Sequence, residues 1–301
     1  MAAARVSVIA MISSAPRVSV VVPAYNEEKA IRQCVLAALD QTVPAHEIIV
    51  VDNRSTDRTA AIVAELAAEH PSVRLIEQHA VQGLIPTRNA GLDAATGDVL
   101  GRIDADSLLE PTWVEEVAAA FCDETVDAAT GPVAYYDMPL RRFGLKADDR
   151  IRQLMLRLSN EYHFLFGSNM ALRADAWRTI RDEVCLDEDD QFHEDIDISL
   201  HLAEAGLRAR YVPTMVSGMS ARRLEDSPRD YQYYVWRFER TYARHNVRSR
   251  AVRAPMWVYL AIYPPLKIIR SVMARREQLA ERAARSGAAL PPGPGTPPAL
   301  P

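Results

Sequence analysis

The sequence predicts an α/β fold in which a mostly parallel, wound sheet is flanked by helices and followed by a C-terminal helical extension. Short β-branched runs alternate with stretches of helical apolar spacing through the first hundred residues. The first run, 18–22, is apolar without alternation, which is typical of a strand buried on both faces. The 301 residues, 49% hydrophobic and 25% charged, suffice for one large domain plus an appendage.

The first half of the chain has the more regular pattern. Ser55 or Thr56 is expected to cap the second helix. No Gly-x-Gly-x-x-Gly follows the first strand, which argues against a dinucleotide-binding dehydrogenase. Strands are expected at 18–22, 46–51, 73–76 and 98–103, and helices at 27–39, 56–67, 86–95 and 113–121.

The second half is less regular. Gly206 is expected to end the helix that starts at 193, and Pro264 and Pro265 are expected to break the last helical region. Strands are expected at 128–136, 170–173 and 210–212, and helices at 147–161, 193–206, from 228 onward, and at 266–285.

The chain divides by composition into four parts. Residues 1–16 are expected to form a flexible extension, 17–220 the α/β domain, 221–285 a basic helical extension, and 286–301 a disordered Pro/Gly-rich tail. Three scattered cysteines without metal-ligand spacing favour a reducing compartment. No uninterrupted apolar run reaches 18 residues, so no spanning helix is expected and the predicted location is cytoplasmic.

Charge is distributed unevenly. Residues 221–285 hold 15 Lys and Arg against 6 Asp and Glu, whereas residues 1–220 hold 20 against 34. So acidic a body argues against nucleic acid as a partner. The basic extension suits phosphates or peripheral contact with an anionic membrane, with Trp257, Tyr259 and Tyr263 at headgroup level. An equally weighted alternative is that these helices pack Trp257 onto the sheet and expose their arginines.

Asp104 and Asp106 follow the fourth expected strand. Residues two apart in an extended segment point to the same side, so both carboxylates face one volume beyond the strand's carboxyl end. In open α/β sheets ligands bind at that edge, and a hard cation such as Mg²⁺ or Mn²⁺ relieves the repulsion. The alternative is a polar turn with Ser107 capping a following helix.

Six short motifs occur in an order that resembles glycosyltransferase family 2. The resemblance covers residues 17–215 and implies the GT-A fold and an inverting, metal-dependent enzyme that uses a nucleotide-diphospho-sugar. The motifs are 19–28 (SVVVPAYNEE), 51–59 (VDNRSTDRT), 88–97 (RNAGLDAATG), 103–106 (IDAD), 167–171 (GSNMA) and 193–195 (HED).

The resemblance implies a donor site in the first half. Asp52 is expected to accept the imide N–H of a uracil-type base, which favours a UDP-linked donor. Arg88 suits a phosphate or the base edge. Asp106 is the expected direct ligand of Mn²⁺ or Mg²⁺. The remaining expected donor residues are Pro23 and Tyr25 beside the base, Glu27 on the ribose, and Asp104 on the sugar, the ribose or the metal.

The resemblance places the donor sugar and acceptor in the second half. Gly167, Ser168, Asn169 and Glu194 are expected to line this part of the site. Asp195 is the expected general base, taking the acceptor hydroxyl's proton as its oxygen attacks the anomeric carbon. The alternative for these acids is that they collect in a helix's first turn because the dipole favours them there.

Three departures from the family pattern stand out. Asn53 and Arg54 replace the more usual Asp-Gly of the second motif. The stretch 217–224 lacks the histidine that many members place there as a further metal ligand. At 232–236 the Gln-x-x-Arg-Trp of polysaccharide synthases lacks its arginine, so a processive synthase is not expected.

The predicted function is transfer of one hexose-like sugar to a hydroxyl-bearing glycan or lipid-linked acceptor, as in cell-envelope polysaccharide synthesis. One alternative makes the acceptor a polyprenyl phosphate, which is already ionised and needs no base. Another is a nucleotide-sugar-binding protein without turnover. A sugar nucleotidyltransferase is disfavoured because no Gly-rich, Arg-containing loop lies near the first strand.

Overall fold

The computed structural model describes residues 15–159, 163–187, 191–249 and 251–286. The expected flexible extension and disordered tail lie almost entirely outside these residues, as does the expected end of a helix at 161. The division at 220 and 285 also stays a prediction.

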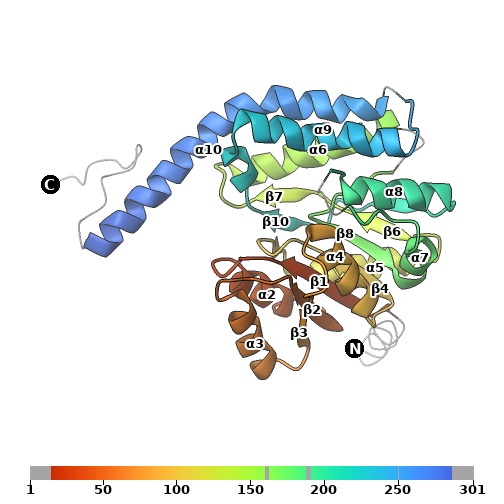
Figure 1. The fold of residues 1–301 in the computed structure, drawn as a ribbon, viewed down its shortest axis with the longest axis horizontal. Coiled ribbons are helices and arrows are strands. Elements are labelled where there is room, and N and C mark those ends of the chain that lie inside the picture. Colours follow the sequence, from red (N-terminus) through yellow and green to blue (C-terminus); the bar gives the residue numbers. More distant parts are fainter. Residues whose placement is uncertain (1–14, 160–162, 188–190, 250, 287–301) are drawn as a thin grey trace, which may run out of the picture.

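A seven-stranded sheet forms the centre of the protein (Figure 1), in the order β3-β2-β1-β4-β8-β6-β9. β8 pairs antiparallel with both neighbours and the other pairings are parallel, so the expected mostly parallel sheet is confirmed. Its strands are β1 (Val18–Ala24), β2 (Glu47–Asp52), β3 (Val73–Glu77), β4 (Val99–Arg102), β6 (Ala128–Thr130), β8 (Met170–Arg173) and β9 (Ala209–Tyr211).

The strand expected at 128–136 is wrong as a single element. It divides at Gly131 and Pro132, and its second part joins a small second sheet of β5 (Leu108–Leu109), β10 (Ser217–Met219) and β7 (Val133–Tyr135). Backbone atoms of Val212 and Met215 lie where a side chain at position 131 would stand. Proline has no N–H for a ladder, so the chain changes sheets here.

Helices cover both faces of the large sheet. Val20 and Val22 pack with α2 (Ile31–Leu39), α3 (Thr59–Glu69) and α5 (Trp113–Phe121). Val21, pointing the other way, packs with α4 (Leu84–Ala94), α7 (Ala174–Ile180) and α8 (Glu194–Glu204). The buried valines of β1 therefore serve two cores, as the run without alternation predicts.

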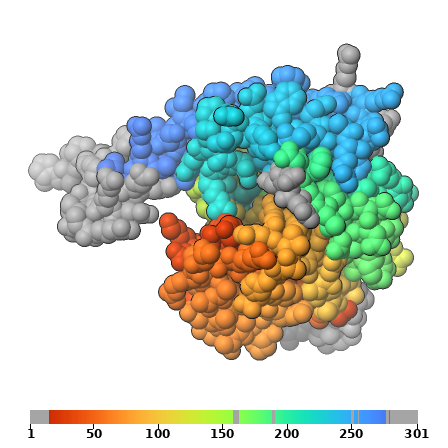
Figure 2. All heavy atoms as spheres, viewed as in Figure 1, coloured from red at the N-terminus to blue at the C-terminus, as the bar shows by residue number. Residues whose placement is uncertain are grey.

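The later helices form a third layer, with α9 and α10 side by side in Figure 1. Tyr231, Val235 and Tyr242 pack with Ile196 and Leu200 of α8 in a separate apolar cluster. The helices of this third layer are α6 (Arg141–Ser159), α9 (Pro228–Arg244) and α10 (Ala254–Ser286), with short 3₁₀ turns η1 (Arg222–Glu225) and η2 (Ala251–Arg253). In Figure 2 the first third of the chain forms the lower half of the face and the last third the upper half.

Four expected helix limits are corrected. α10 runs through Pro264 and Pro265, which are exposed, because packing against α9 and η1 outweighs the backbone bonds that proline removes. Neither Ser55 nor Thr56 caps α3. Instead, Asp57 accepts the Thr59 N–H at 2.9 Å. α2 begins at Ile31 and α6 at Arg141, whereas Gly206 (φ +73°) ends α8 as expected.

Among the described residues, no helix combines the length and apolar character needed to cross a membrane.

Candidate active site

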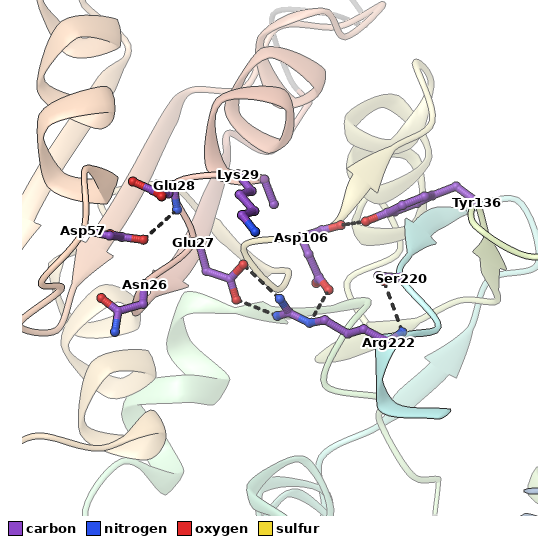
Figure 3. Close-up of a pocket in the computed structure, with 10 residues that line it drawn as sticks. Asn26, Glu27, Glu28, Lys29, Asp57, Asp106, Tyr136, Ser220 and Arg222 are labelled. Carbon is purple, nitrogen blue, oxygen red and sulfur yellow. Dashed lines mark hydrogen bonds and ion pairs between the residues drawn. The ribbon is translucent and has the colours of Figure 1, made fainter. Parts of the chain in front are cut away.

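The carboxyl ends of β1 and β4 face η1 across a cavity of about 400 Å³ (Figure 3). The loop after β1 supplies Glu27, the loop after β4 supplies Asp106, and η1 supplies Arg222. The cavity is lined by Asn26, Glu27, Glu28, Lys29, Ala30, Asp57, Asp106, Tyr136, Ser220 and Arg222.

The Arg222 guanidinium joins two acids from different loops. It donates to the Glu27 carboxylate at 3.0 and 2.6 Å, and its Nε lies 3.1 Å from Asp106 Oδ2. Burial raises the pKa of Asp106 to about 6; Arg222 opposes this rise, while Asp104 and Glu27 add to it. Glu27 and Asp106 thus share one guanidinium, with Asp104 nearby, and oxygen donors with excess negative charge fit a hard divalent cation.

A second set of ion pairs connects the loop after β4 with α4, β4 and the start of α8. Arg88 Nη2 donates to Asp104 Oδ1 at 3.0 Å, and Arg88 Nη1 and Arg102 Nη1 both donate to Glu194. Arg102 is fully buried, and burial first and Arg88 second lower its pKa to about 9. Glu194 is therefore shared by two arginines beneath the site.

Asp195 occupies the first turn of α8, facing the loop before β8. Its Oδ2 accepts the Gly167 N–H at 2.8 Å. Burial acts to raise its pKa, but His193, Arg102 and that N–H together hold the pKa below its ordinary value. A side chain at Gly167 would run into Arg102. The aspartate is ionised at neutral pH and able to accept a proton.

Asp52 lies buried at the end of β2. Its Oδ2 accepts the Ser55 N–H at 3.1 Å, while its Oδ1 is buried without a hydrogen-bond partner among the described residues. Such an orphaned acceptor is costly unless a ligand donor reaches it. Tyr25, at 51% exposure, stands on the neighbouring loop.

Comparison with known proteins agrees with this geometry. The family profile described as Glycosyl transferase family 2 matches residues 19–181, and one described as Glycosyl transferase family group 2 matches residues 102–273. The chain belongs to glycosyltransferase family 2.

Relatives of this family 2 chain include transferases from several organisms. Glycosyltransferase AglE of Haloferax volcanii is 32% identical over 42% of each chain. The uncharacterized glycosyltransferase YibD of Escherichia coli is 34% identical over 40% of this chain and 34% of its own. An uncharacterized glycosyltransferase of Haemophilus influenzae is 26% identical over 67% of this chain and 64% of its own. The chain thus spans under half the length of the first two relatives.

Solved structures confirm the GT-A fold. The mannosyltransferase PcManGT of Pyrobaculum calidifontis, solved with GDP-Man and Mn²⁺, has a TM-score of 0.60 and 23% identity, covering 93% of this chain and 78% of that one. S. aureus TarS with UDP-GlcNAc has a TM-score of 0.55 and 20% identity, covering 82% and 71%.

The structure brings most of the predicted site residues of this family 2 chain together. Ser107, however, caps no helix, because it leads into β5 and its Oγ accepts the Asp104 N–H at 3.2 Å. The Asp104–Arg88–Glu194 ion pairs connect the loop after β4 to the start of α8, next to Asp195. Pro23 lies in β1, opposite Val51 of β2, and its role toward the base stays a prediction.

Asn169 and Ser168, both expected to line the sugar site, differ in burial. The Asn169 amide is fully buried, accepting the Trp113 indole N–H at 2.8 Å and donating to the carbonyls of Pro132 and Met215 at 2.9 and 2.7 Å. It joins the two sheets from inside. Ser168 is half-buried beside it. Their roles toward a sugar stay predictions.

Sequence reasoning missed Arg222 as a site residue. The basic run that contains it indicates a charged extension, but no local pattern shows that η1 turns back over the loops after β1 and β4.

The structure also explains why asparagine stands at position 53, where the family pattern more often has aspartate. Its Nδ2 donates to the Gln78 and Val81 carbonyls at 2.7 and 3.0 Å, and its Oδ1 accepts the Gly83 N–H at 2.8 Å. An aspartate has no donors for these carbonyls.

Proposed function

We propose that this protein is an inverting glycosyltransferase that moves one sugar from a nucleotide-diphospho-sugar to a hydroxyl acceptor. The observation that carries the proposal is the convergence of Glu27, Asp104 and Asp106 on one side of the Arg88–Glu194 ion pair, with ionised Asp195 on the other. The first group suits a charged diphosphate with its cation, and the second suits a hydroxyl that must lose a proton.

Asp52 reads the base in this proposal. Its Oδ1, which has no partner in the described part of the chain, accepts a ring N–H, which uracil and guanine carry and which adenine and cytosine lack. The donors named in the neighbouring structures, GDP-Man and UDP-GlcNAc, both carry such a base. Tyr25 stacks on the base from the adjoining loop, and we favour a UDP-linked donor.

The acids around Asp106 suit Mn²⁺ or Mg²⁺. Asp106 and Asp104 would hold the ion, which when bound neutralises charge on the departing diphosphate. Arg222 must then give up part of its contact with Asp106. Its guanidinium stays within reach of the same volume and binds the diphosphate oxygens, a role that suits its planar fork.

Asp195 takes the proton of the acceptor hydroxyl. The oxygen of the acceptor hydroxyl attacks the anomeric carbon from the face opposite the diphosphate. The new bond forms as the carbon–oxygen bond to the diphosphate breaks. The Gly167 N–H holds the Asp195 carboxylate in place. A phosphate acceptor needs no such base, so an ionised aspartate here supports a hydroxyl acceptor.

The long helix α10 is proposed to bring the enzyme to the inner face of an anionic membrane. Trp257 is 64% exposed, which contradicts the alternative that it packs onto the sheet, and Ile268, Val272 and Leu279 are 67, 48 and 56% exposed. The expectation that Tyr263 lies at headgroup level is wrong, because its ring is buried against Tyr231 of α9. The helix projects beyond the body (Figure 1). Apolar side chains with interspersed arginines suit an interfacial helix, which favours a lipid-linked acceptor.

The deciding experiment is thermal unfolding with a panel of nucleotide-sugars, with and without Mn²⁺. UDP-sugars are expected to stabilise the protein only with Mn²⁺, by about 2.7 kcal/mol at a hundred times the dissociation constant. Asp106→Ala should remove this shift, and Asp175→Ala, on the exposed side of α7, should keep it. The donor-site assignment fails if no nucleotide gives a metal-dependent shift.

A further inference from the structure

A second cluster of metal-ligand side chains lies between α8 and the end of α9, and shares no residue with the cavity around Asp106. Asp197 and His201 are one turn apart on α8, and His245 is the residue that ends α9. One ligand atom from each of the three lies within 4.8 Å of the other two.

The cluster is shielded from water. The side chains of Asp197, His245 and His201 are 1, 5 and 13% exposed. Asp197 Oδ2 accepts the Cys185 N–H at 2.8 Å, which leaves Oδ1 facing the histidines. A buried carboxylate between two imidazoles requires protons or a cation to balance its charge.

The Glu204 carboxylate lies beside the second nitrogen of each imidazole. His201 Nδ1 and His245 Nδ1 lie 3.2 and 3.4 Å from the two oxygens of the Glu204 carboxylate. The hydrogen bond between His245 Nε2 and Asp197 Oδ1 places a proton between these two atoms. A cation would replace that proton, with both Nδ1–H groups directed to Glu204 and each neutral ring presenting a lone pair on Nε2. His245 Nε2 is 2.9 Å and His201 Nε2 3.8 Å from Asp197 Oδ1. Among the described residues, the buried His201 Nε2 has no hydrogen-bond partner.

We propose that Asp197, His201 and His245 bind a transition-metal cation of the Zn²⁺ type. Two imidazoles and a carboxylate are ordinary zinc ligands, and carboxylates that accept the second N–H of ligating histidines accompany them, as Glu204 does here. Tetrahedral bonds of about 2.0–2.2 Å put ligand atoms about 3.4 Å apart. His201 Nε2 must therefore move closer to Asp197 Oδ1 and His245 Nε2 slightly away from it. The nitrogen ligands separate this site from the all-oxygen set around Asp106, which suits Mn²⁺ or Mg²⁺.

The ion would stabilise the side of the active site that carries the base. α8 begins with Glu194 and Asp195, and its later turns would be linked to α9 through His201 and His245. The link adds to the apolar packing of α8 on α9. Three protein ligands leave one tetrahedral position for water. Because the ion would link α8 to α9, its loss should affect unfolding more directly than donor binding.

The test uses the full chain after removal of metal with a chelator. One equivalent of Zn²⁺ is expected to bind in competition with a chromophoric chelator and to raise the unfolding temperature, and Co²⁺ in its place should give visible d–d absorption. His245→Gln and His201→Gln should each weaken Zn²⁺ binding at least 100-fold, and Glu204→Gln about 10–100-fold.

Two controls make the result decisive. His79→Gln, at an exposed histidine on the other half of the protein, and Asp106→Ala should both leave Zn²⁺ affinity unchanged. The proposal is overturned if the wild-type chain binds no Zn²⁺ at micromolar concentration, or if His245→Gln binds it as tightly as wild type. It is equally overturned if Asp106→Ala removes the bound Zn²⁺, because the ion then belongs to the donor site.

Discussion

Arg222 Nε lies 3.1 Å from Asp106 Oδ2, so a side chain from η1 reaches the acid expected to hold the donor's metal. α10 anchors η1 in this position. The Tyr263 hydroxyl donates to the Asp226 carbonyl at 2.7 Å, and Lys267 Nζ donates to the Glu225 carbonyl at 3.1 Å. The proposed membrane helix and the donor site are thus connected through one short turn.

Arg222→Gln should strengthen binding of Mn²⁺ to the donor-free enzyme by about fivefold, because a competing cation is removed from a half-exposed ion pair. It should also lower kcat, since the diphosphate loses a positive partner. Mn²⁺ binding is measured by electron paramagnetic resonance without nucleotide. Arg229→Gln, exposed on the first turn of α9, is the matched control. Unchanged Mn²⁺ affinity in Arg222→Gln would show that the guanidinium does not compete.

Asp195→Asn should lower kcat by about a hundred- to ten-thousandfold, the usual contribution of a positioned base, and leave donor affinity unchanged. The amide keeps the shape and an acceptor for the Gly167 N–H, but cannot take a proton. Single-turnover transfer and nucleotide-sugar binding separate the two effects, with Asp175→Asn as control. Full activity of Asp195→Asn would favour the polyprenyl-phosphate acceptor.

Glu194→Gln should lower the free energy of unfolding by about 3 kcal/mol, because Arg88 and fully buried Arg102 lose their shared carboxylate. Urea unfolding at neutral pH measures the loss. Glu124→Gln, exposed before β6, should change stability little. A stability equal to that of wild type would mean that the two arginines do not depend on Glu194 for compensation.

The chain up to residue 121 could be predicted closely because its strands are continuous apolar runs and its helices have clean periodicity. α5 begins and ends where the pattern predicts, at Trp113 and Phe121. β5 and β10 could not be found, since strands of two and three residues carry too few side chains to show a period. The continuity of α10 through Pro264 and Pro265 depends on tertiary packing, which local propensity does not contain.

The donor half of the site could be predicted from motifs at strand ends, because parallel strands bring their carboxyl ends to one edge. Arg222 and Arg102 could not. Arg102 reads as one polar residue inside a strand, and only the fold shows Glu194 beside it. Asn169 shows the reverse difficulty, because a motif cannot distinguish an amide that faces a ligand from one that joins two sheets.

Replacing Trp257 and Ile268 together with serine should remove binding of the full chain to vesicles that contain phosphatidylglycerol. Each side chain is more than half exposed on α10, and losing either apolar contact should weaken binding by about tenfold or more. Cosedimentation measures this, with pure phosphatidylcholine vesicles as the uncharged comparison. Leu36→Ser, at a 42% exposed position on α2, should bind as wild type does. Equal binding by the double variant would contradict membrane contact through α10.

Glu47 should make stability depend on pH below its ordinary pKa of 4.5. Burial opposes ionisation, but bonds from Thr96, Arg74 and Ser19 outweigh it and lower the pKa to about 2. A carboxyl with a lowered pKa in the folded state contributes stability that is complete above 4.5 and lost as the pH falls toward 2.

The stability gap between wild type and Glu47→Gln should therefore be largest at pH 7 and shrink between pH 4.5 and 2, the interval set by the ordinary and the lowered pKa of Glu47. Urea unfolding at several pH values measures this gap. Glu69→Gln, exposed at the end of α3, should follow the wild-type curve throughout. A gap that stays constant with pH would show that Glu47 is not held ionised by its partners, and that the bonds from Thr96 and Ser19 stabilise the protein equally with a neutral side chain.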